Sequence, residues 1–176
     1  MLRALTSAFF AAWLLAAPAQ AEVVASAPTG FVVKQVVSVP VQREEAYRRF
    51  IDIASWWESD HTFSGDAANM SITPRADGCW CEKLKDRGFV RHMAVVYAAP
   101  GETIRFAGGL GPLQEMAVSG AMTVAFVADG PSTTVTLTYA VGGYAPAGLA
   151  SLAPIVDGVL GAQMLRYREA AGRRRS

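Results

Sequence analysis

The stretch AGLASLAPIVDGVLGAQMLRYREAA, residues 147–171, decides how the rest of the chain is interpreted. Its large apolar residues recur every three or four positions, which places them on one side of a helix. An apolar side this continuous needs a partner that covers it. The stretch therefore predicts one long helix near the C-terminus that packs on the rest of the domain. The apolar stripe consists of Leu149, Leu152, Val156, Leu160, Met164 and Tyr167.

Three other residues in this stretch bear on how the helix packs. Pro154 lacks an amide hydrogen and disfavours helical dihedrals at the residue before it, so the helix either starts near Pro154 or is kinked there. Gly158 and Gly161 each cost about 1 kcal/mol relative to alanine in a helix interior. Two explanations are open: close packing of the helix on a sheet, or room left for a bound molecule.

A run of alternating segments before the helix provides its partner. Short turns such as Asp86-Arg87-Gly88, Pro100-Gly101 and Gly130-Pro131 separate these segments. Strands joined by such short connections pair antiparallel. The glycine-rich run 108–112 lacks the pattern of a phosphate loop, and we expect it to form a lip over one end of a cavity. The predicted strands are 70–73, 79–85, 89–97, 103–107, 117–128 and 133–141.

The segment before this meander predicts a strand followed by two short helices. Residues 31–39 are rich in valine and read as a strand, and residues 42–52 have helical spacing of apolar side chains. Trp56 and Trp57 follow in a second short helix or turn. Two adjacent indoles cannot both face one core from a helix, so at least one should lie on a rim or line a cavity. The alternative is that both pack as a cap on the open end of the barrel. His61 is either solvated or a polar contact at the cavity mouth.

Residues 1–21 have the features of a secretory signal peptide. Arg3 precedes an almost unbroken apolar run over residues 4–17, and Ala19-Gln20-Ala21 matches a cleavage signal. The apolar run is shorter than the roughly 20 residues that span a bilayer. We therefore expect cleavage after Ala21, export to a periplasm or the cell exterior, and no stable membrane insertion afterwards.

Removal of residues 1–21 leaves a chain of balanced charge. Arg3 is their only charged residue, so 15 of the 16 basic residues remain against 15 acidic ones. Such a chain offers no electrostatic field for nucleic acid. The remaining length suits one domain with a single core. We expect a linker at 22–29, the domain at 30–171, and a solvated basic tail at 172–176.

This order of elements resembles the START-like or SRPBCC superfamily. The resemblance rests on the layout and on four local pieces: VPVQREEAYRRF at 39–50, the Trp56-Trp57 pair, GLGPLQE at 109–115 and LAPIVDGVLGAQM at 152–164. It implies an α+β helix-grip fold, in which a curved antiparallel sheet wraps around the C-terminal helix. It also implies a cavity for apolar or aromatic molecules, but no particular reaction, because polyketide cyclases and lipid-transfer domains share this frame. The cytosolic role of the related Hsp90 ATPase activators conflicts with export.

Glu82 and His92 form the best candidate pair for chemistry. A three-residue loop at 86–88 would set Glu82 directly opposite His92, about 5 Å away, whereas a change of one residue would place Arg91 there instead. Glu82 shares a strand face with Trp80, and the opposite face, with two lysines, should meet water. A buried glutamate beside a histidine can act as a general acid or base on a ligand. The alternative is a structural cross-strand pair.

Cys79 and Cys81 raise the question of a disulfide in an oxidising compartment. Residues two apart on a regular strand have Cα atoms about 6.6 Å apart and parallel side chains, at the far end of the disulfide range. We therefore favour a reduced pair, although a local bulge would permit the bond. A zinc site with a histidine of the next strand lacks a recognisable fourth ligand, so we expect neither a metal nor a cofactor.

Three hypotheses of function follow from this pattern. The first is an exported protein that binds an apolar, aromatic or lipid-like molecule between sheet and helix. The second is a cyclase- or hydrolase-type enzyme that uses Glu82 and His92, and the third is an interaction domain with a filled core. The residues expected to line a binding cavity are Trp56, Trp57, His61, Trp80, Leu110, Leu113, Met122, Tyr139, Val156 and Leu160.

Overall fold

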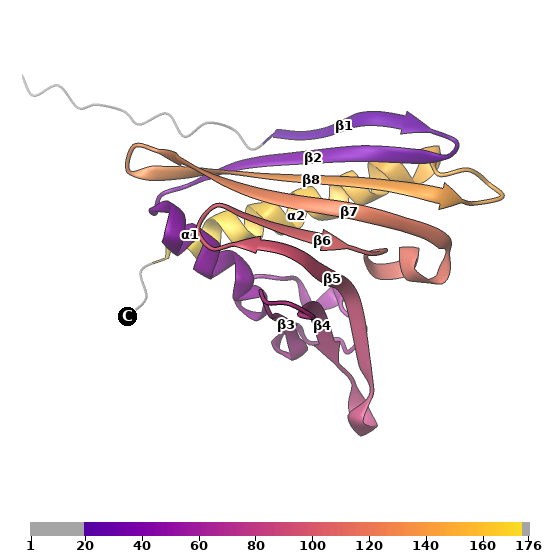
Figure 1. The fold of residues 1–176 in the computed structure, drawn as a ribbon, viewed down its shortest axis with the longest axis horizontal. Helices are drawn as coiled ribbons and strands as arrows, with labels where there is room; N and C mark the ends of the chain where they lie inside the picture. The colour runs from indigo at the N-terminus through magenta and orange to yellow at the C-terminus, as the bar shows by residue number, and fades with distance from the viewer. Residues whose placement is uncertain (1–19, 174–176) are drawn as a thin grey trace, which may run out of the picture.

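The computed structural model describes residues 20–173, which form one eight-stranded antiparallel sheet and two α-helices (Figure 1). The strand order is β1-β2-β8-β7-β6-β5-β4-β3, and every neighbouring pair is antiparallel. The strands are β1 (Gln20–Ala27), β2 (Gly30–Val39), β3 (Met70–Ile72), β4 (Cys79–Lys83), β5 (Phe89–Ala99), β6 (Thr103–Ala107), β7 (Ala117–Asp129) and β8 (Ser132–Tyr144). The α-helices are α1 (Arg43–Ile51) and α2 (Ala153–Gly172). Short 3-10 turns are η1 (Ile53–Ser55), η2 (Ser59–His61), η3 (Ala67–Asn69), η4 (Lys85–Arg87), η5 (Gly111–Glu115) and η6 (Ala150–Leu152).

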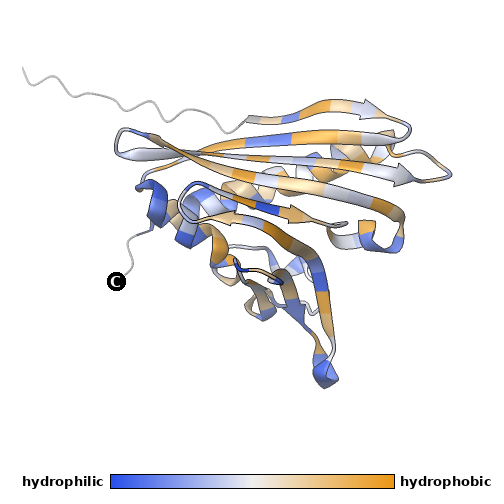
Figure 2. Ribbon diagram, viewed as in Figure 1, coloured by the Kyte–Doolittle hydropathy of each residue, from blue (hydrophilic) through white to orange (hydrophobic). Residues whose placement is uncertain are grey.

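Helix α2 runs along one face of the curved sheet, as the periodicity of its apolar residues predicts (Figure 1). Side chains of β2 alternate between buried and half-buried, so one face of the strand looks toward the helix. On α2, Leu160, Met164 and Tyr167 are almost fully buried. The predicted α+β helix-grip architecture is therefore confirmed. Figure 2 shows the hydrophobic colour along the long strands and hydrophilic colour at the turn between β4 and β5.

The start of α2 and its two glycines have clear structural roles. The helix begins at Ala153 with Pro154 in its first turn, where a missing amide hydrogen costs no intrahelical bond. A Cβ atom on Gly161 would lie 3.2 Å from Oε1 of Gln35, so this glycine permits close packing of α2 on β2. Gly158 has open space around it. Both glycines border a hollow of about 350 Å³ between α2 and β2, and neither lines the larger cavity described below.

The expectation of a linker at residues 22–29 is wrong. Most of this segment belongs to β1, which pairs with β2 from Gln20 opposite Val36 to Ala27 opposite Gly30. Its side chains are exposed, so the strand shows no alternation of buried and exposed residues that would have revealed it. Residues 1–19 of the expected signal peptide and residues 174–176 of the expected basic tail lie outside the described residues.

The expectation of reduced cysteines is also wrong, because Cys79 and Cys81 form a disulfide. The register of β4 against β5 shifts between Trp80 and Cys81. The Cα atoms of the two cysteines lie 5.4 Å apart, closer than on a regular strand and within the disulfide range. The two side chains lie half-buried on the outer face of β4, while Trp80 points into the core.

Among residues 20–173, no helix is both long enough and apolar enough to cross a bilayer. Within the same range, no three histidine, cysteine or acidic side chains gather closely enough to hold a metal ion.

Candidate functional site

A cavity of about 390 Å³ lies at the end of the sheet that faces the first turns of α2. Its walls come from five separate parts of the chain: the loop after η1, strand β5, the turn η5, strand β8, and the start of α2. Their apolar side chains dominate the lining, and the volume is in the range of small-molecule sites. The lining residues are Trp57, Asp60, His61, Thr62, Phe63, His92, Leu110, Gly111, Pro112, Leu113, Met116, Tyr139, Leu152, Ile155, Val156, Val159 and Leu160.

Toward the C-terminal end of α2, aromatic rings fill the gap between α1, α2 and the sheet. Phe50 of α1 contacts Tyr167, Trp56 and Phe126 at ring-centroid distances of 5.5, 5.4 and 5.8 Å. The Tyr167 hydroxyl donates to the carbonyl of Ala46 at 2.8 Å, which closes this end. The cavity is therefore confined to the end where Val156 and Leu160 face η5.

Tyr139 holds the glycine-rich loop against one wall of the cavity. Its hydroxyl donates to the carbonyl of Gly108 and accepts from the amide of Leu110, both at 3.0 Å. Burial raises the pKa of Tyr139 to about 12, although the Leu110 amide opposes this shift. The phenol is therefore a structural hydrogen-bonding group at neutral pH. As expected from the sequence, the loop forms a lip over the cavity.

The loop after η1 forms the opposite wall and is fastened to α2. The indole of Trp57 donates to the carbonyl of His61 at 2.9 Å. Gln163, buried on α2, accepts from the amide of Glu58 at 2.9 Å and lies 3.0 Å from Nδ1 of His61. Because its amide oxygen is engaged by Glu58, the amide nitrogen of Gln163 must donate to His61. Arg166 adds an ion pair with Glu58.

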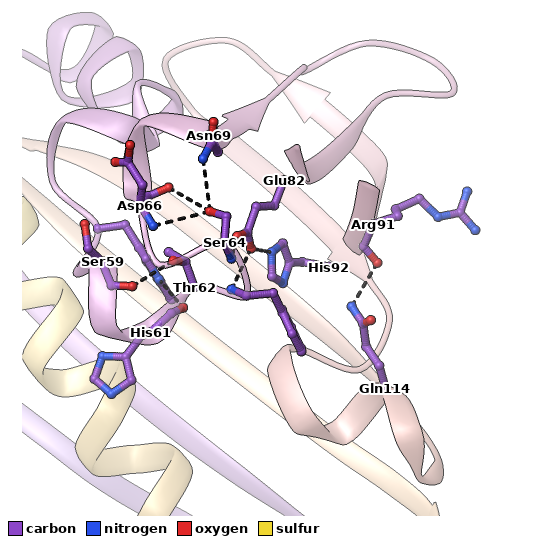
Figure 3. Close-up of polar contacts among 12 residues, drawn as sticks. Ser59, His61, Thr62, Ser64, Asp66, Asn69, Glu82, Arg91, His92 and Gln114 are labelled. Carbon is purple, nitrogen blue, oxygen red and sulfur yellow. Dashed lines mark hydrogen bonds and ion pairs between the residues drawn. The ribbon is translucent and has the colours of Figure 1, made fainter. Parts of the chain in front are cut away.

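Glu82 and His92 meet at the edge of this wall (Figure 3). Nε2 of His92 lies 2.9 Å from Oε2 of Glu82, so the predicted contact is confirmed. The predicted register is wrong, because Glu82 pairs with Val90. His92 is instead the extra residue of a bulge on β5, which turns both His92 and Met93 toward the interior.

Glu82 also fixes the loop that lines the cavity. Its two carboxylate oxygens accept hydrogen bonds from the backbone amides of Phe63 and Ser64. Figure 3 shows Ser64 beside the carboxylate. Burial raises the pKa of Glu82, but the hydrogen bonds from Ser64, Phe63 and His92 outweigh it and hold this pKa below its ordinary value. Glu82 is therefore an ionised, buried acceptor with three donors around it.

The protonation of His92 follows from this partner. Burial lowers the pKa of His92 more than Glu82 raises it, so the imidazole is neutral at pH 7. Beside an ionised carboxylate, the single proton of a neutral imidazole belongs on Nε2. Nδ1 is then an acceptor, and it is buried without a hydrogen-bond partner among the described residues.

Most of the residues expected to line a binding cavity do so. Those found in the lining are Trp57, His61, Leu110, Leu113, Tyr139, Val156 and Leu160, together with His92. Three do not reach it. Trp56 packs on Phe50 and Tyr167, Trp80 lies behind Trp57 and against Phe106, and Met122 is fully buried in the sheet core. Glu82 also stays outside the lining, so it touches the cavity only through His92 and the loop.

The sequence interpretation missed two groups of lining residues. Asp60, Thr62 and Phe63 lie in a polar loop whose path depends on the Glu82 and Gln163 side chains, and no local pattern encodes those contacts. The second group lies on the same elements as lining residues that were predicted. Helical spacing from Val156 and nearness in sequence to Leu113 could have identified its members. It consists of Gly111, Pro112, Met116, Leu152, Ile155 and Val159.

No protein-family model and no curated protein matches this sequence. Solved structures of similar fold include a conserved protein of unknown function from Enterococcus faecalis, with a TM-score of 0.56 and 9% identity over 88% of this chain and 77% of that one. DynU16, a protein of the dynemicin biosynthetic locus, has a TM-score of 0.53 and 18% identity over 78% of this chain and 46% of its own. The di-domain ARO/CYC BexL from the BE-7585A biosynthetic pathway has a TM-score of 0.53 and 16% identity, over 85% of this chain and 52% of its own.

The present chain thus spans about half the length of DynU16 and of BexL. At these identities the similarity shows a shared fold, and that fold is consistent with the SRPBCC-like resemblance of the sequence.

Proposed function

We propose that this protein is exported and binds a small apolar, aromatic or lipid-like molecule in the cavity beside the first turns of α2. The observation that supports this most strongly is the cavity itself, with apolar side chains from five parts of the chain around about 390 Å³. Small-molecule sites in proteins are concave and lined mainly by apolar side chains, and this cavity has both features.

Two structures of similar fold support the same proposal. DynU16 comes from a biosynthetic locus and BexL from a biosynthetic pathway, which are settings for small molecules. The proposal of export rests on the sequence of residues 1–21. An apolar ligand agrees with export, because apolar molecules dissolve poorly in water and need a protein to carry them there. Fractionation of cells that express the full chain tests export: the mature protein should begin at Glu22 and lie outside the cytoplasm.

Binding can be tested with the protein purified from its exported fraction. Native mass spectrometry should detect a retained apolar compound, or an added one such as naphthalene. Val159→Trp should reduce binding at least tenfold, because Val159 lines the cavity and a tryptophan there would fill it. Leu165→Trp is the matched control, since Leu165 lies on the same helix outside this cavity. If wild type binds no apolar compound, or if both variants bind equally well, the proposal fails.

A cyclase- or hydrolase-type activity that uses Glu82 and His92 is the second candidate. It is favoured by one observation, the buried 2.9 Å contact that leaves Nδ1 of His92 free to accept a proton. Glu82 does not reach the cavity, so it would position His92 while His92 acts on the substrate. In that case Glu82→Gln would lower kcat for an accepted compound and alter its pH profile. Unchanged turnover would remove Glu82 from the mechanism.

A further inference from the structure

His92 differs from the other polar groups around the cavity in having an unsatisfied buried atom. The Tyr139 hydroxyl both donates and accepts, and the Thr62 hydroxyl donates to the carbonyl of Ser59 at 2.7 Å. The Trp57 indole donates to the carbonyl of His61, whose own Nδ1 accepts from Gln163. Nδ1 of His92 is out of contact with water and has no partner among the described residues. Buried acceptors in proteins are rarely left in this state.

The Glu82 side chain decides what kind of group Nδ1 can accept. Glu82 accepts hydrogen bonds from two backbone amides and from Nε2–H of His92, so the imidazole ring cannot flip without losing its bond to Glu82. Nδ1 therefore remains a hydrogen-bond acceptor, and a ligand group that binds to it must be a donor. A charged ammonium donor would be costly to place in an apolar cavity, whereas a neutral hydroxyl is not.

The ring of Phe63 lies beside His92 in the lining of the cavity. Its ring centroid lies 5.8 Å from that of His92. The Phe63 backbone is fixed by Glu82, but residue Phe63 is 51% exposed, so its ring has room for another rotamer.

We propose that the ligand carries a hydroxyl group, and that this group donates a hydrogen bond to Nδ1 of His92 once the Phe63 ring has turned aside. This inference rests on the proposed function, since it names the chemistry of the molecule that the same cavity takes. The apolar walls provide most of the contact surface, and His92 fixes the orientation of the ligand. Glu82 acts as a positioning residue, because it sets the tautomer of His92 without touching the ligand.

A matched pair of probes tests the proposal. 2-Naphthol and 2-methoxynaphthalene share a ring system and an oxygen atom, but only 2-naphthol can donate a hydrogen bond. Titration calorimetry with the wild-type protein should show that 2-naphthol binds about tenfold more tightly. His92→Phe, which keeps a flat ring and removes the acceptor, should reduce the two affinities to the same value. Leu165→Phe changes a residue of α2 outside the cavity lining and should leave the tenfold ratio in place.

A second measurement is nitrogen NMR of the wild-type imidazoles. The chain has two histidines, so their resonances can be assigned by comparison with His92→Phe. Addition of 2-naphthol should move the Nδ1 resonance of His92, and 2-methoxynaphthalene should leave it in place. Equal binding of the two probes, or an unmoved Nδ1 resonance at saturation with 2-naphthol, overturns the hydroxyl proposal and leaves apolar binding intact. If naphthalene and both derivatives all fail to bind, the proposed function falls and this inference falls with it.

Discussion

The ring of Tyr139 lies against Gly120, so that a Cβ atom on residue 120 would be 2.5 Å from Cε2 of the ring. The same Cβ would be 2.8 Å from the carbonyl oxygen of Ala140, which belongs to backbone and cannot move aside. Only glycine fits at position 120 while Tyr139 keeps its place. Tyr139 in turn holds Leu110 and the lip of the cavity, so one missing side chain on β7 sets the position of a cavity wall.

Gly120→Ala should therefore destabilise the protein and weaken the binding of apolar probes. We expect the free energy of unfolding to fall by about 1–3 kcal/mol, because the added methyl group must displace either the ring or the strand. Urea unfolding measures the stability, and hydrogen exchange at the Leu110 amide reports on the lip. Gly158→Ala is the control: Gly158 has open space around it, and this change should be neutral or stabilise by up to about 1 kcal/mol. Equal effects of the two substitutions would contradict the packing argument.

The pKa of His92 predicts a loss of stability on mild acidification. Since burial holds this pKa in the folded protein below the ordinary value of 6.5, the unfolded chain binds more protons just below pH 6.5. The free energy of unfolding should accordingly fall as the pH decreases from about 6.5 toward the folded pKa. Urea unfolding between pH 8 and pH 5 measures this slope.

The substitution His92→Phe should flatten this slope, because it removes the titrating group. Glu82 should cause a separate decrease in the free energy of unfolding at lower pH. Its pKa in the folded protein lies below the ordinary 4.5, so acidification again favours the unfolded chain. A slope that persists in His92→Phe would show that His92 is not the group responsible.

The sequence predicted the long strands and α2 correctly because their periodicity is local. Each buried face of β7 or β8 repeats every second residue, and the stripe of α2 repeats every three or four. β1 escaped detection because it is an edge strand with exposed side chains on both faces, and only its pairing with β2 defines it. Such pairing is a long-range property that no local pattern contains.

The sequence predicted which loop and which helix line the candidate site, but not every side chain in it. The places of Leu110, Val156 and Leu160 follow from the positions of the loop and the helix, whereas the place of Phe63 depends on the hydrogen bond from its amide to Glu82. The contact between Glu82 and His92 was expected from a hairpin count that sets these two residues opposite each other, whereas Glu82 pairs with Val90, two residues away. The bulge on β5 turns His92 inward and makes the contact despite this offset, and bulges leave no dependable local signal in a single sequence.

The disulfide between Cys79 and Cys81 should contribute little to global stability. It closes a very short loop, so the chain-entropy estimate is about 1–2 kcal/mol, at the low end for disulfides. Cys79→Ser/Cys81→Ser should lower the free energy of unfolding by that amount, and wild type with a dithiol reductant should match it. A loss above about 4 kcal/mol would mean that the bond also holds the bulge that points His92 inward. NMR of the His92 imidazole in the double variant distinguishes the two cases.

Gln163 should control whether the loop after η1 stays closed over the cavity. Gln163 is 1% exposed, and its side chain satisfies both the amide of Glu58 and Nδ1 of His61, so leucine at this position would remove the hydrogen-bond partner of the Glu58 amide. We expect Gln163→Leu to cost about 1–3 kcal/mol and to speed hydrogen exchange at Glu58. Arg166→Met is the comparison, because its ion pair with Glu58 is partly exposed and should contribute about 0–1 kcal/mol. If exchange at Glu58 were unchanged in Gln163→Leu, the remaining contacts of the loop, those with Glu82 and Arg166, would be sufficient to hold it, and Gln163 would not control the loop.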